Sequence, residues 1–199
     1  MYTDFLIVII CSYLVGSIPS GLLLGKYIWH VDLRKHGSKN IGATNAWRTL
    51  GKLPGIIVFI VDLCKGIFGV YLGMSLIDSS TAMILGGIFA IIGHSASIFL
   101  KFKGGKGVAT GLGVLIMLMP KVSFFVFCLW LIIVIISKYV SLGSIIAAIF
   151  VPILAYIFGL TTDFIVFGVV AALFVIYRHK TNIKRLLQGT ENKIKAGHR

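Results

Sequence analysis

The chain has 199 residues, of which 58% are hydrophobic, and its mean hydropathy is +1.00. A soluble domain of this length cannot bury so much apolar surface, so the composition excludes a soluble globular protein and predicts a polytopic membrane protein. The formal net charge is +13, from 19 Lys and Arg against 6 Asp and Glu. Such an excess indicates nucleic acid, anionic lipid or an anionic substrate as a partner, and the placement of the charges decides between them.

Apolar runs predict an all-α protein with seven transmembrane helices. Six runs are long enough to cross a hydrocarbon core of about 30 Å, whereas the fourth is short enough to be re-entrant by length alone. The first run follows Asp4 and no basic segment, which predicts a retained span and not a signal peptide. The runs lie at residues 4–25, 53–77, 81–100, 107–119, 121–137, 141–159 and 163–178.

The basic residues fall almost entirely on one side if all seven runs cross the membrane. That side holds 17 of the 19 Lys and Arg, while the other holds three Asp and only Lys121. The positive-inside rule then predicts an N-terminus outside and a C-terminus in the cytoplasm. We expect residues 1–199 to form a single membrane-embedded domain, with a basic cytoplasmic tail at 178–199.

Three features inside the apolar runs affect the expected packing. Pro19 should kink the first helix, because proline lacks the N–H that the helix needs. Asp62 and Lys65 are three residues apart and so share one helix face. Ionisable groups at membrane depth are costly, so this pair is either part of a functional site or a self-neutralising pair that packs the bundle. The three cysteines lie in apolar runs at unrelated spacings and predict neither a disulfide framework nor a metal site.

The first cytoplasmic segment is dense in small polar side chains and reads Gly-Ser-Lys-Asn-Ile-Gly-Ala-Thr-Asn-Ala-Trp-Arg from residue 37. Hydroxyl and amide groups can hydrogen-bond a polar ligand, and an arginine can form a two-pronged contact with phosphate or carboxylate. The alternative is a solvated turn. The candidate ligand-binding residues are Ser38, Asn40, Thr44, Asn45 and Arg48.

The second cytoplasmic segment reads Phe-Lys-Gly-Gly-Lys-Gly-Val-Ala-Thr from residue 102. Glycine permits positive φ, so successive N–H groups can converge as an anion-binding nest beside the positive end of a following helix. Leu100 and Gly107 stand where a nucleotide P-loop needs Gly and Ser or Thr, so the segment is not of that type. The alternative is a flexible hairpin between membrane helices. The predicted phosphate-binding residues are Gly104, Gly105, Lys106 and Gly107.

Histidines accompany the second and third segments. His94 lies one to two turns before the end of the third predicted helix and is either a site residue or a packing or capping residue. In the tail, His179, Asn182 and Arg185 recur every third residue, so they share one face of a helix that leaves the membrane. Arg178 adds a cation at the start of this tail. A purely electrostatic lipid anchor explains the basic residues but not His179 and Asn182.

These three segments, in this order, resemble the signature segments of the bacterial acyl-phosphate:glycerol-3-phosphate acyltransferase family. The Asp62-x-x-Lys65-Gly66 pattern and Tyr139-Val-Ser141 are also similar to it, whereas Lys39 stands where the family commonly has Gly. The resemblance implies a seven-helix inner-membrane enzyme with its active site on the cytoplasmic face. Its members transfer an acyl chain from acyl phosphate to the 1-hydroxyl of glycerol 3-phosphate, giving lysophosphatidic acid and phosphate in phospholipid synthesis.

The resemblance also suggests roles for the candidate residues. Lys106 and the glycine N–H groups would hold phosphate, while Ser38 and Arg48 would position glycerol phosphate or stabilise charge at the reacting carbonyl. His179 and Asn182 would orient the acceptor. The sequence has no His-x4-Asp pair, so the general base is either His179 or, as we favour, a phosphate oxygen of the donor. Glu191 is expected to hold the tail against a nearby cation.

The expected partners are acyl phosphate, glycerol 3-phosphate, the lipid bilayer and a soluble enzyme that supplies acyl phosphate. We expect no cofactor, no metal ion and no nucleic acid. A transporter for phosphorylated metabolites is the main alternative. No internal repeat is visible, and the polar groups gather in loops and not at the bilayer midplane. A scaffold that binds anionic lipid is the third interpretation.

Overall fold

The computed structural model describes residues 2–194, and this part of the chain is all α-helical, with no β-strand. The predicted all-α class is therefore confirmed. The elements are α1 (Tyr2–Ser17), α2 (Ser20–Tyr27), the 3-10 turn η1 (Leu33–Lys35), α3 (Ala43–Leu50), α4 (Lys52–Ile77), α5 (Ser80–Ser95), the 3-10 turn η2 (Ile98–Leu100), α6 (Val108–Leu118), α7 (Pro120–Ser137), α8 (Val140–Ile157), α9 (Thr162–Arg178) and α10 (Lys180–Leu187).

Five stretches of the described chain are long and apolar enough to cross a membrane. They are α1 continued through α2, α4, α5 continued through η2, α7 and α8. Helices α9 and α10 form a sixth if the pair, bent by 61°, counts as one span. Helix α6 has only 11 residues, so the predicted shortness of the fourth apolar run is confirmed. The count of seven spans and the orientation of the termini stay predictions.

The first apolar run is broken at Pro19, as predicted. Helix α1 ends at Ser17 and α2 begins at Ser20. The break leaves the carbonyl of Ile18 outside the regular helical ladder, and it accepts hydrogen bonds from the Ser20 N–H at 2.9 Å and from Lys65 Nζ at 2.6 Å. A proline that interrupts the ladder thus exposes a backbone acceptor that a neighbouring helix can use.

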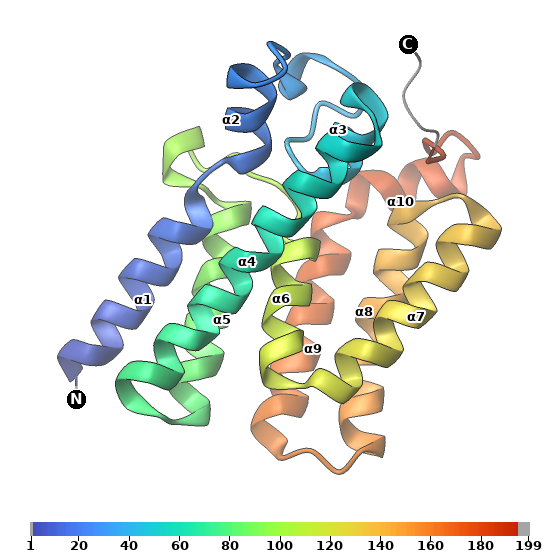
Figure 1. Cartoon of the computed structure of the whole chain (residues 1–199). Coiled ribbons are helices and arrows are strands. Elements are labelled where there is room, and N and C mark those ends of the chain that lie inside the picture. Colours follow the sequence, from blue (N-terminus) through green and yellow to red (C-terminus); the bar gives the residue numbers. More distant parts are fainter. Residues whose placement is uncertain (1, 195–199) are drawn as a thin grey trace. The chain divides into compact units, whose positions relative to one another are not determined.

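The described chain forms two compact units, residues 2–117 and 118–194, which we describe separately. In the first unit, α1, α4 and α5 pack side by side (Figure 1). Their contacts depend on glycine: a Cβ at Gly16 would overlap the backbone of Ala90, and one at Gly69 would overlap the carbonyl of Gly86. Small residues let helix backbones approach closely where lipid gives no hydrophobic drive for association.

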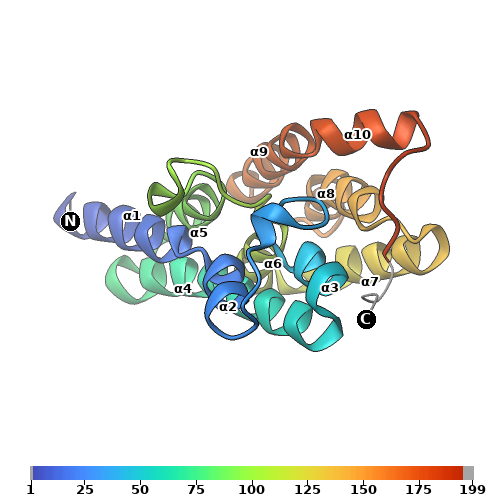
Figure 2. The same ribbon diagram turned by 90° about the horizontal axis from the view of Figure 1, so that it is seen from above.

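A small apolar core lies at one end of the first unit and holds the segment that connects α2 to α4. Leu33, Ala46 and Val58 are fully buried there, from η1, α3 and α4 respectively. A Cβ at Gly55 would overlap the backbone of Trp47, so α3 lies directly on α4. Figures 1 and 2 show α2 and α3 together at this end of the unit. The core fixes the polar loop between η1 and α3.

The second unit consists of α7, α8 and α9, with α10 continuing from α9 after a bend. Gly168 of α9 lies against Pro152 of α8, where a Cβ would come within 3.2 Å of the proline backbone. After α10 the chain returns toward α7 (Figure 2). There the N–H of Ile194 donates to the carbonyl of Lys138 at 2.7 Å. The tail predicted at 178–199 is thus described to Ile194, and residues 195–199 lie outside the described part of the chain.

Candidate active site

Asn45 organises the polar loop of the first unit. Its side chain is 2% exposed; its Oδ1 accepts from the Ser38 N–H at 2.8 Å, and its Nδ2 contacts the carbonyls of Leu33, His36 and Asn40 at 2.7 to 3.1 Å. Both polar atoms of the amide are engaged by the loop itself. We therefore revise the expected role of Asn45 from ligand binding to loop construction.

Two left-handed residues shape the same loop. Gly37 has φ +57°, and a Cβ there would overlap Oδ1 of Asn45, so only glycine fits. Lys39 has φ +59°. The left-handed region costs a non-glycine residue about 1–2 kcal/mol, which explains why glycine suits this position in the family that the chain resembles. Lys39 itself adopts this left-handed conformation, so the turn forms with lysine at this position.

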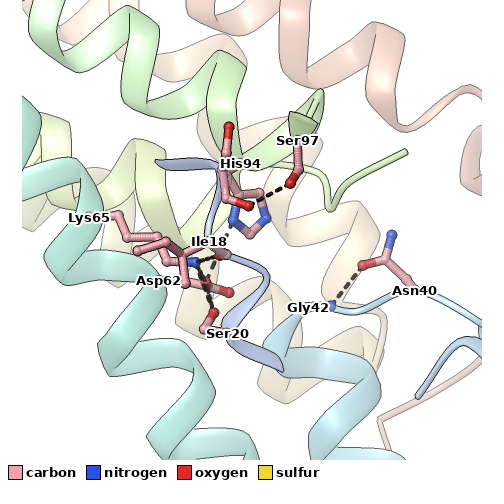
Figure 3. A network of polar contacts seen from close by, with 9 residues as sticks. Ile18, Ser20, Asn40, Gly42, Asp62, Lys65, His94 and Ser97 are labelled. Atoms are coloured by element: carbon pink, nitrogen blue, oxygen red, sulfur yellow. Dashed lines mark hydrogen bonds and ion pairs between the residues drawn. The ribbon is translucent and has the colours of Figure 1, made fainter. Parts of the chain in front are cut away.

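The remaining candidates of this segment lie around the Asn45 scaffold. Ser38 is exposed, while Asn40 uses its Oδ1 to accept from the Gly42 N–H at 2.9 Å (Figure 3). Thr44 and Arg48 are half-buried and lie four residues apart on α3, so they share one face of this helix. The segment therefore presents a hydroxyl from the loop and a hydroxyl and a guanidinium from the helix.

The glycine segment is tied to the end of α5. The N–H of Gly104 donates to the carbonyl of Ser95 at 3.1 Å, and the N–H of Gly105 donates to the carbonyl of His94 at 3.0 Å. The expectation that these two amides form an anion nest is therefore wrong, because they are directed at α5. A single sequence gives no sign of this pairing, since the partners are backbone carbonyls.

The start of α6 offers the better anion site. Gly107 has φ +77° and directly precedes Val108, the first residue of α6. The first four N–H groups of a helix lack intrahelical acceptors and lie at the positive end of its dipole. Lys106 adds a full charge beside them. The phosphate-binding role of Lys106 and Gly107 stays a prediction, while Gly104 and Gly105 are held against the end of α5 by their backbone hydrogen bonds.

His94 connects the glycine segment to the buried pair of α4. Its side chain is 6% exposed, and its Nδ1 lies 3.5 Å from Oδ1 of Asp62. On the other edge of the ring, Nε2 occupies the position that a Cβ of Gly105 would take. The ring therefore lies between a carboxylate and the glycine segment, and Figure 3 shows it beside Asp62. The sequence suggested both His94 and Asp62 as candidates, but not that they meet.

Lys65 completes this buried network. Its Nζ contacts Asp62 Oδ1 at 2.7 Å, Ser20 Oγ at 2.8 Å and the Ile18 carbonyl at 2.6 Å, and Ser20 Oγ also donates to Asp62. The side chains of Asp62 and Lys65 are 2% and 5% exposed. Asp62 and Lys65 thus neutralise each other's charge, which agrees with the interpretation of this pair as self-neutralising. It also secures the broken end of α1 and the ring of His94.

Glu191 is the centre of the polar cluster in the second unit. Its carboxylate accepts from Asn182 Nδ2 at 2.7 Å, Arg185 Nε at 2.7 Å and Ser141 Oγ at 2.9 Å. Burial opposes ionisation, but these three hydrogen bonds and the charge of Arg185 outweigh it and hold the pKa of Glu191 below its ordinary value. The prediction that Glu191 holds the tail against a cation is confirmed, and that cation is Arg185.

His179 lies at the junction of α9 and α10 and is 2% exposed. Its Nδ1 is 2.8 Å from the carbonyl of Val175. A carbonyl only accepts, so Nδ1 carries the proton, and a neutral ring then has its lone pair on Nε2. Asn182 follows one turn later with its amide directed at Glu191, and Arg178 is half-buried at the end of α9. The predicted common face of Asn182 and Arg185 is confirmed by their shared partner.

The site residues thus form two groups, one in each unit. Within residues 2–194, no three His, Cys, Asp or Glu side chains lie where they could jointly hold a metal ion. Both groups contain hydrogen-bond donors and cations suited to anionic oxygens.

The comparison with known proteins gives consistent results over nearly the whole chain. The family model described as glycerol-3-phosphate acyltransferase matches residues 6–189. The glycerol-3-phosphate acyltransferase of Carboxydothermus hydrogenoformans is 50% identical over 183 residues, which is 92% of this chain and 93% of that one. Glycerol-3-phosphate acyltransferase 2 of Moorella thermoacetica is 47% identical over 190 residues, covering 96% and 97%.

Solved structures agree with these relatives. Two crystal structures of PlsY (YgiH), an integral membrane glycerol 3-phosphate acyltransferase, match the fold. The glycerol 3-phosphate form has a TM-score of 0.91 at 39% identity and covers 96% of each chain. The lysophosphatidic acid form has a TM-score of 0.88 at 38% identity, covering 95% of this chain and 94% of that one.

Proposed function

This chain belongs to the glycerol-3-phosphate acyltransferase family of integral membrane enzymes, and we propose that its acyl donor is acyl phosphate. The proposed reaction joins the acyl group to the 1-hydroxyl of glycerol 3-phosphate and releases lysophosphatidic acid and inorganic phosphate. A soluble enzyme that makes acyl phosphate would supply the donor. The observation that supports this proposal is the start of α6, where Lys106 and the left-handed Gly107 directly precede a helix N-terminus whose first N–H groups would donate to a phosphate group.

The proposed topology places this chemistry on the cytoplasmic face of the bacterial inner membrane. Seven spans, with α6 as a short fourth one, put 17 of the 19 basic residues on one side. The positive-inside rule assigns that side to the cytoplasm, with the N-terminus outside. Both substrates carry phosphate, so a basic face also attracts them. The whole chain would then act as one catalytic domain.

The proposed mechanism is direct transfer. The 1-hydroxyl oxygen of glycerol 3-phosphate attacks the acyl carbonyl carbon, and its proton passes to a base. The tetrahedral intermediate then collapses, the carbonyl re-forms and the C–O bond to phosphate breaks. Arg48 and Lys106 would neutralise the negative charge that develops on the carbonyl and phosphate oxygens, which is the usual largest contribution of such sites. Ser38 would donate a hydrogen bond to a substrate oxygen.

Two bases remain open for the proton of the hydroxyl. An oxygen of the donor phosphate lies next to the attacked carbonyl by its own chemistry and becomes a better acceptor as it leaves. Alternatively, His179 in the tautomer set by the Val175 carbonyl presents a lone pair on Nε2. We favour the donor phosphate, with His179, Arg178 and Asn182 as residues that orient the acceptor. The bond from Asn182 to Glu191 supports such an orienting role, because it fixes the amide.

An acyl-enzyme at Ser38 is the competing mechanism. A serine nucleophile needs an adjacent base that a third group orients. The hydrogen bond that anchors Ser38 comes from its backbone N–H to Asn45, which positions the loop but does not activate the hydroxyl. Direct transfer requires only that two phosphates be held so that the reacting atoms meet at about 3–3.5 Å.

The test uses purified protein in phospholipid vesicles, with an acyl-labelled, long-chain acyl phosphate or acyl-CoA and glycerol 3-phosphate. We expect labelled lysophosphatidic acid from acyl phosphate only. Product from acyl-CoA alone would refute the proposed donor. Omitting the acceptor distinguishes the mechanisms, because direct transfer leaves the denatured protein unlabelled. Stoichiometric label that disappears in Ser38→Ala and is discharged by glycerol 3-phosphate would instead make Ser38 the nucleophile.

A further inference from the structure

We propose that Asp62 and His94 are positioning residues for the phosphate site: Asp62 orients the His94 ring, and the ring holds the glycine segment that leads into α6. The inference rests on the proposed function, because it assigns a role in binding phosphate-bearing substrate. Neither residue is assigned contact with substrate.

The first link joins His94 to the glycine segment in two ways. The backbone carbonyl of His94 accepts from the Gly105 N–H at 3.0 Å, and the Nε2 edge of the ring fills the position of an absent Gly105 side chain. Gly104 is held alongside by the carbonyl of Ser95. The next two residues are Lys106 and Gly107, from which α6 begins. A rotation of the ring would therefore shift the backbone directly before the predicted phosphate donors.

The second link joins the ring to a carboxylate that is itself fixed. Oδ1 of Asp62 lies 3.5 Å from Nδ1 of His94 and receives hydrogen bonds from Lys65 and Ser20. A histidine ring can turn about its terminal torsion, and a charged partner at one nitrogen removes that freedom. Lys65 is fixed in turn by the carbonyl of Ile18 at the break in α1. The chain of contacts thus runs from this break to the glycine segment, inside one unit.

The cost of burying these groups supports a positioning role. A buried ion pair is rarely more stabilising than an apolar pair of the same volume, so charge neutralisation alone does not require Asp62 and Lys65. Packing alone does not require them either, since the neighbouring contacts between α4 and α5 are made by glycine and alanine. What the network supplies is a fixed orientation for His94, which an apolar pair could not give.

The central variants are Asp62→Asn, which keeps the shape but removes the charge, and His94→Asn, which removes the ring edge from Gly105. We expect each to raise the KM for glycerol 3-phosphate about tenfold or more, with a smaller change in kcat, because supporting residues commonly contribute that much to a site. The double variant should be no worse than the poorer single variant if Asp62 acts through His94. Additive losses would overturn the proposed chain of contacts.

A matched control tests whether substitution of any buried polar residue in this unit would raise the KM for glycerol 3-phosphate. Ser12 is fully buried in α1, and its hydroxyl has no hydrogen-bond partner among the described residues. Ser12→Ala should leave the KM unchanged. If it raises the KM as much as Asp62→Asn does, the effect is a general loss of packing and the inference is wrong.

Asp62→Asn leaves Lys65 without its charge partner and could prevent folding. A further variant that combines Asp62→Asn with Lys65→Met removes both charges together and so avoids an unpaired buried cation. It still leaves His94 without a carboxylate, so the same rise in KM is expected. If the variant with Asp62→Asn and Lys65→Met folds and has the wild-type KM for glycerol 3-phosphate, the inference is wrong.

Two measurements separate this inference from the proposed function. Binding of glycerol 3-phosphate to detergent-solubilised protein, followed by calorimetry, needs no acyl donor and no turnover. Hydrogen exchange of peptides that cover residues 95–107 should be faster in Asp62→Asn than in wild type. If the wild type binds glycerol 3-phosphate but does not use acyl phosphate, the proposed donor fails. If it is fully active while Asp62→Asn shows unchanged binding and exchange, the inference alone fails.

Discussion

Gly105→Ala is the sharpest single test of how the glycine segment works. In the sequence this glycine suggested a backbone that approaches phosphate. In the structure its N–H donates to the carbonyl of His94, and an added methyl would overlap Nε2 of the His94 ring. The perturbation therefore acts on the packing of the segment against α5, and only through it on the substrate.

The size of the effect follows from the two ways in which the overlap can be relieved. Turning the His94 ring about 30° away from its rotamer costs about 0.5–1.5 kcal/mol. Lifting the segment instead breaks the backbone hydrogen bonds of Gly104 and Gly105, each contributing about 0.5–1.5 kcal/mol. The two routes together span a penalty of about 0.5–3 kcal/mol for the form that binds substrate, which raises the KM for glycerol 3-phosphate about 2- to 150-fold.

The matched control is Gly111→Ala on α6. A Cβ there would meet only the end of Ile91, at 3.8 Å, which is ordinary contact. Alanine is favoured over glycine in a helix by up to about 1 kcal/mol, so this variant should be as stable as wild type or more so, with unchanged kinetics. Initial rates at varied glycerol 3-phosphate give both constants. A folded Gly105→Ala enzyme with the KM of wild type would refute the argument.

Three further predictions concern other parts of the chain. Arg48→Lys should lose about tenfold or more in activity despite keeping its charge, because lysine cannot make a two-pronged contact; turnover at the wild-type rate would show that charge alone suffices. Glu191→Gln should reduce thermal stability near neutral pH by about 1–3 kcal/mol, the value of charge-assisted hydrogen bonds. Since folding depresses the pKa of Glu191, its contribution is present above the ordinary value of 4.5 and is lost as pH falls through the lower folded pKa, so melting curves of the two proteins should converge in acid. Single cysteines at Lys39 and Lys103 should resist a membrane-impermeant reagent applied to intact cells while one at Thr162 reacts, and labelling of Lys103 would contradict the proposed topology.

Much of the helical framework could be predicted from hydropathy alone. Apolar runs gave the long helices to within a few residues, because the bilayer permits few alternatives to a helix. The break at Pro19 and the shortness of α6 were also predictable, since each depends on local sequence. The left-handed turn at Lys39 could be anticipated only through the resemblance to a family with glycine there.

Contacts between helices could not be predicted in the same way. The meeting of Asp62 with His94 depends on how α4 and α5 are rotated, and close glycine contacts between the helices set that rotation. The bond from Ser141 to Glu191 joins residues 50 positions apart. Hydropathy indicates which residues lie in a span, but it does not determine how each helix is rotated about its axis and therefore which side chains meet. The role of Asn45 in the loop could not be predicted either, because an asparagine that binds a ligand and one that holds a loop together look alike in sequence.

A common principle connects three buried polar residues that hold a loop or the tail. Asn45, His94 and Glu191 are each nearly buried, and each holds a loop or tail through hydrogen bonds to neighbouring backbone or side chains. Leaving a buried polar group unpaired costs about 1–3 kcal/mol, which favours such partnered arrangements. These three buried residues therefore act by holding the loops and the tail in place, whereas Ser38, which is exposed, is free to contact substrate directly. It follows that variants of Asn45, His94 and Glu191 should change stability and KM together. Ser38→Ala, in contrast, should lower kcat/KM with the melting temperature unchanged.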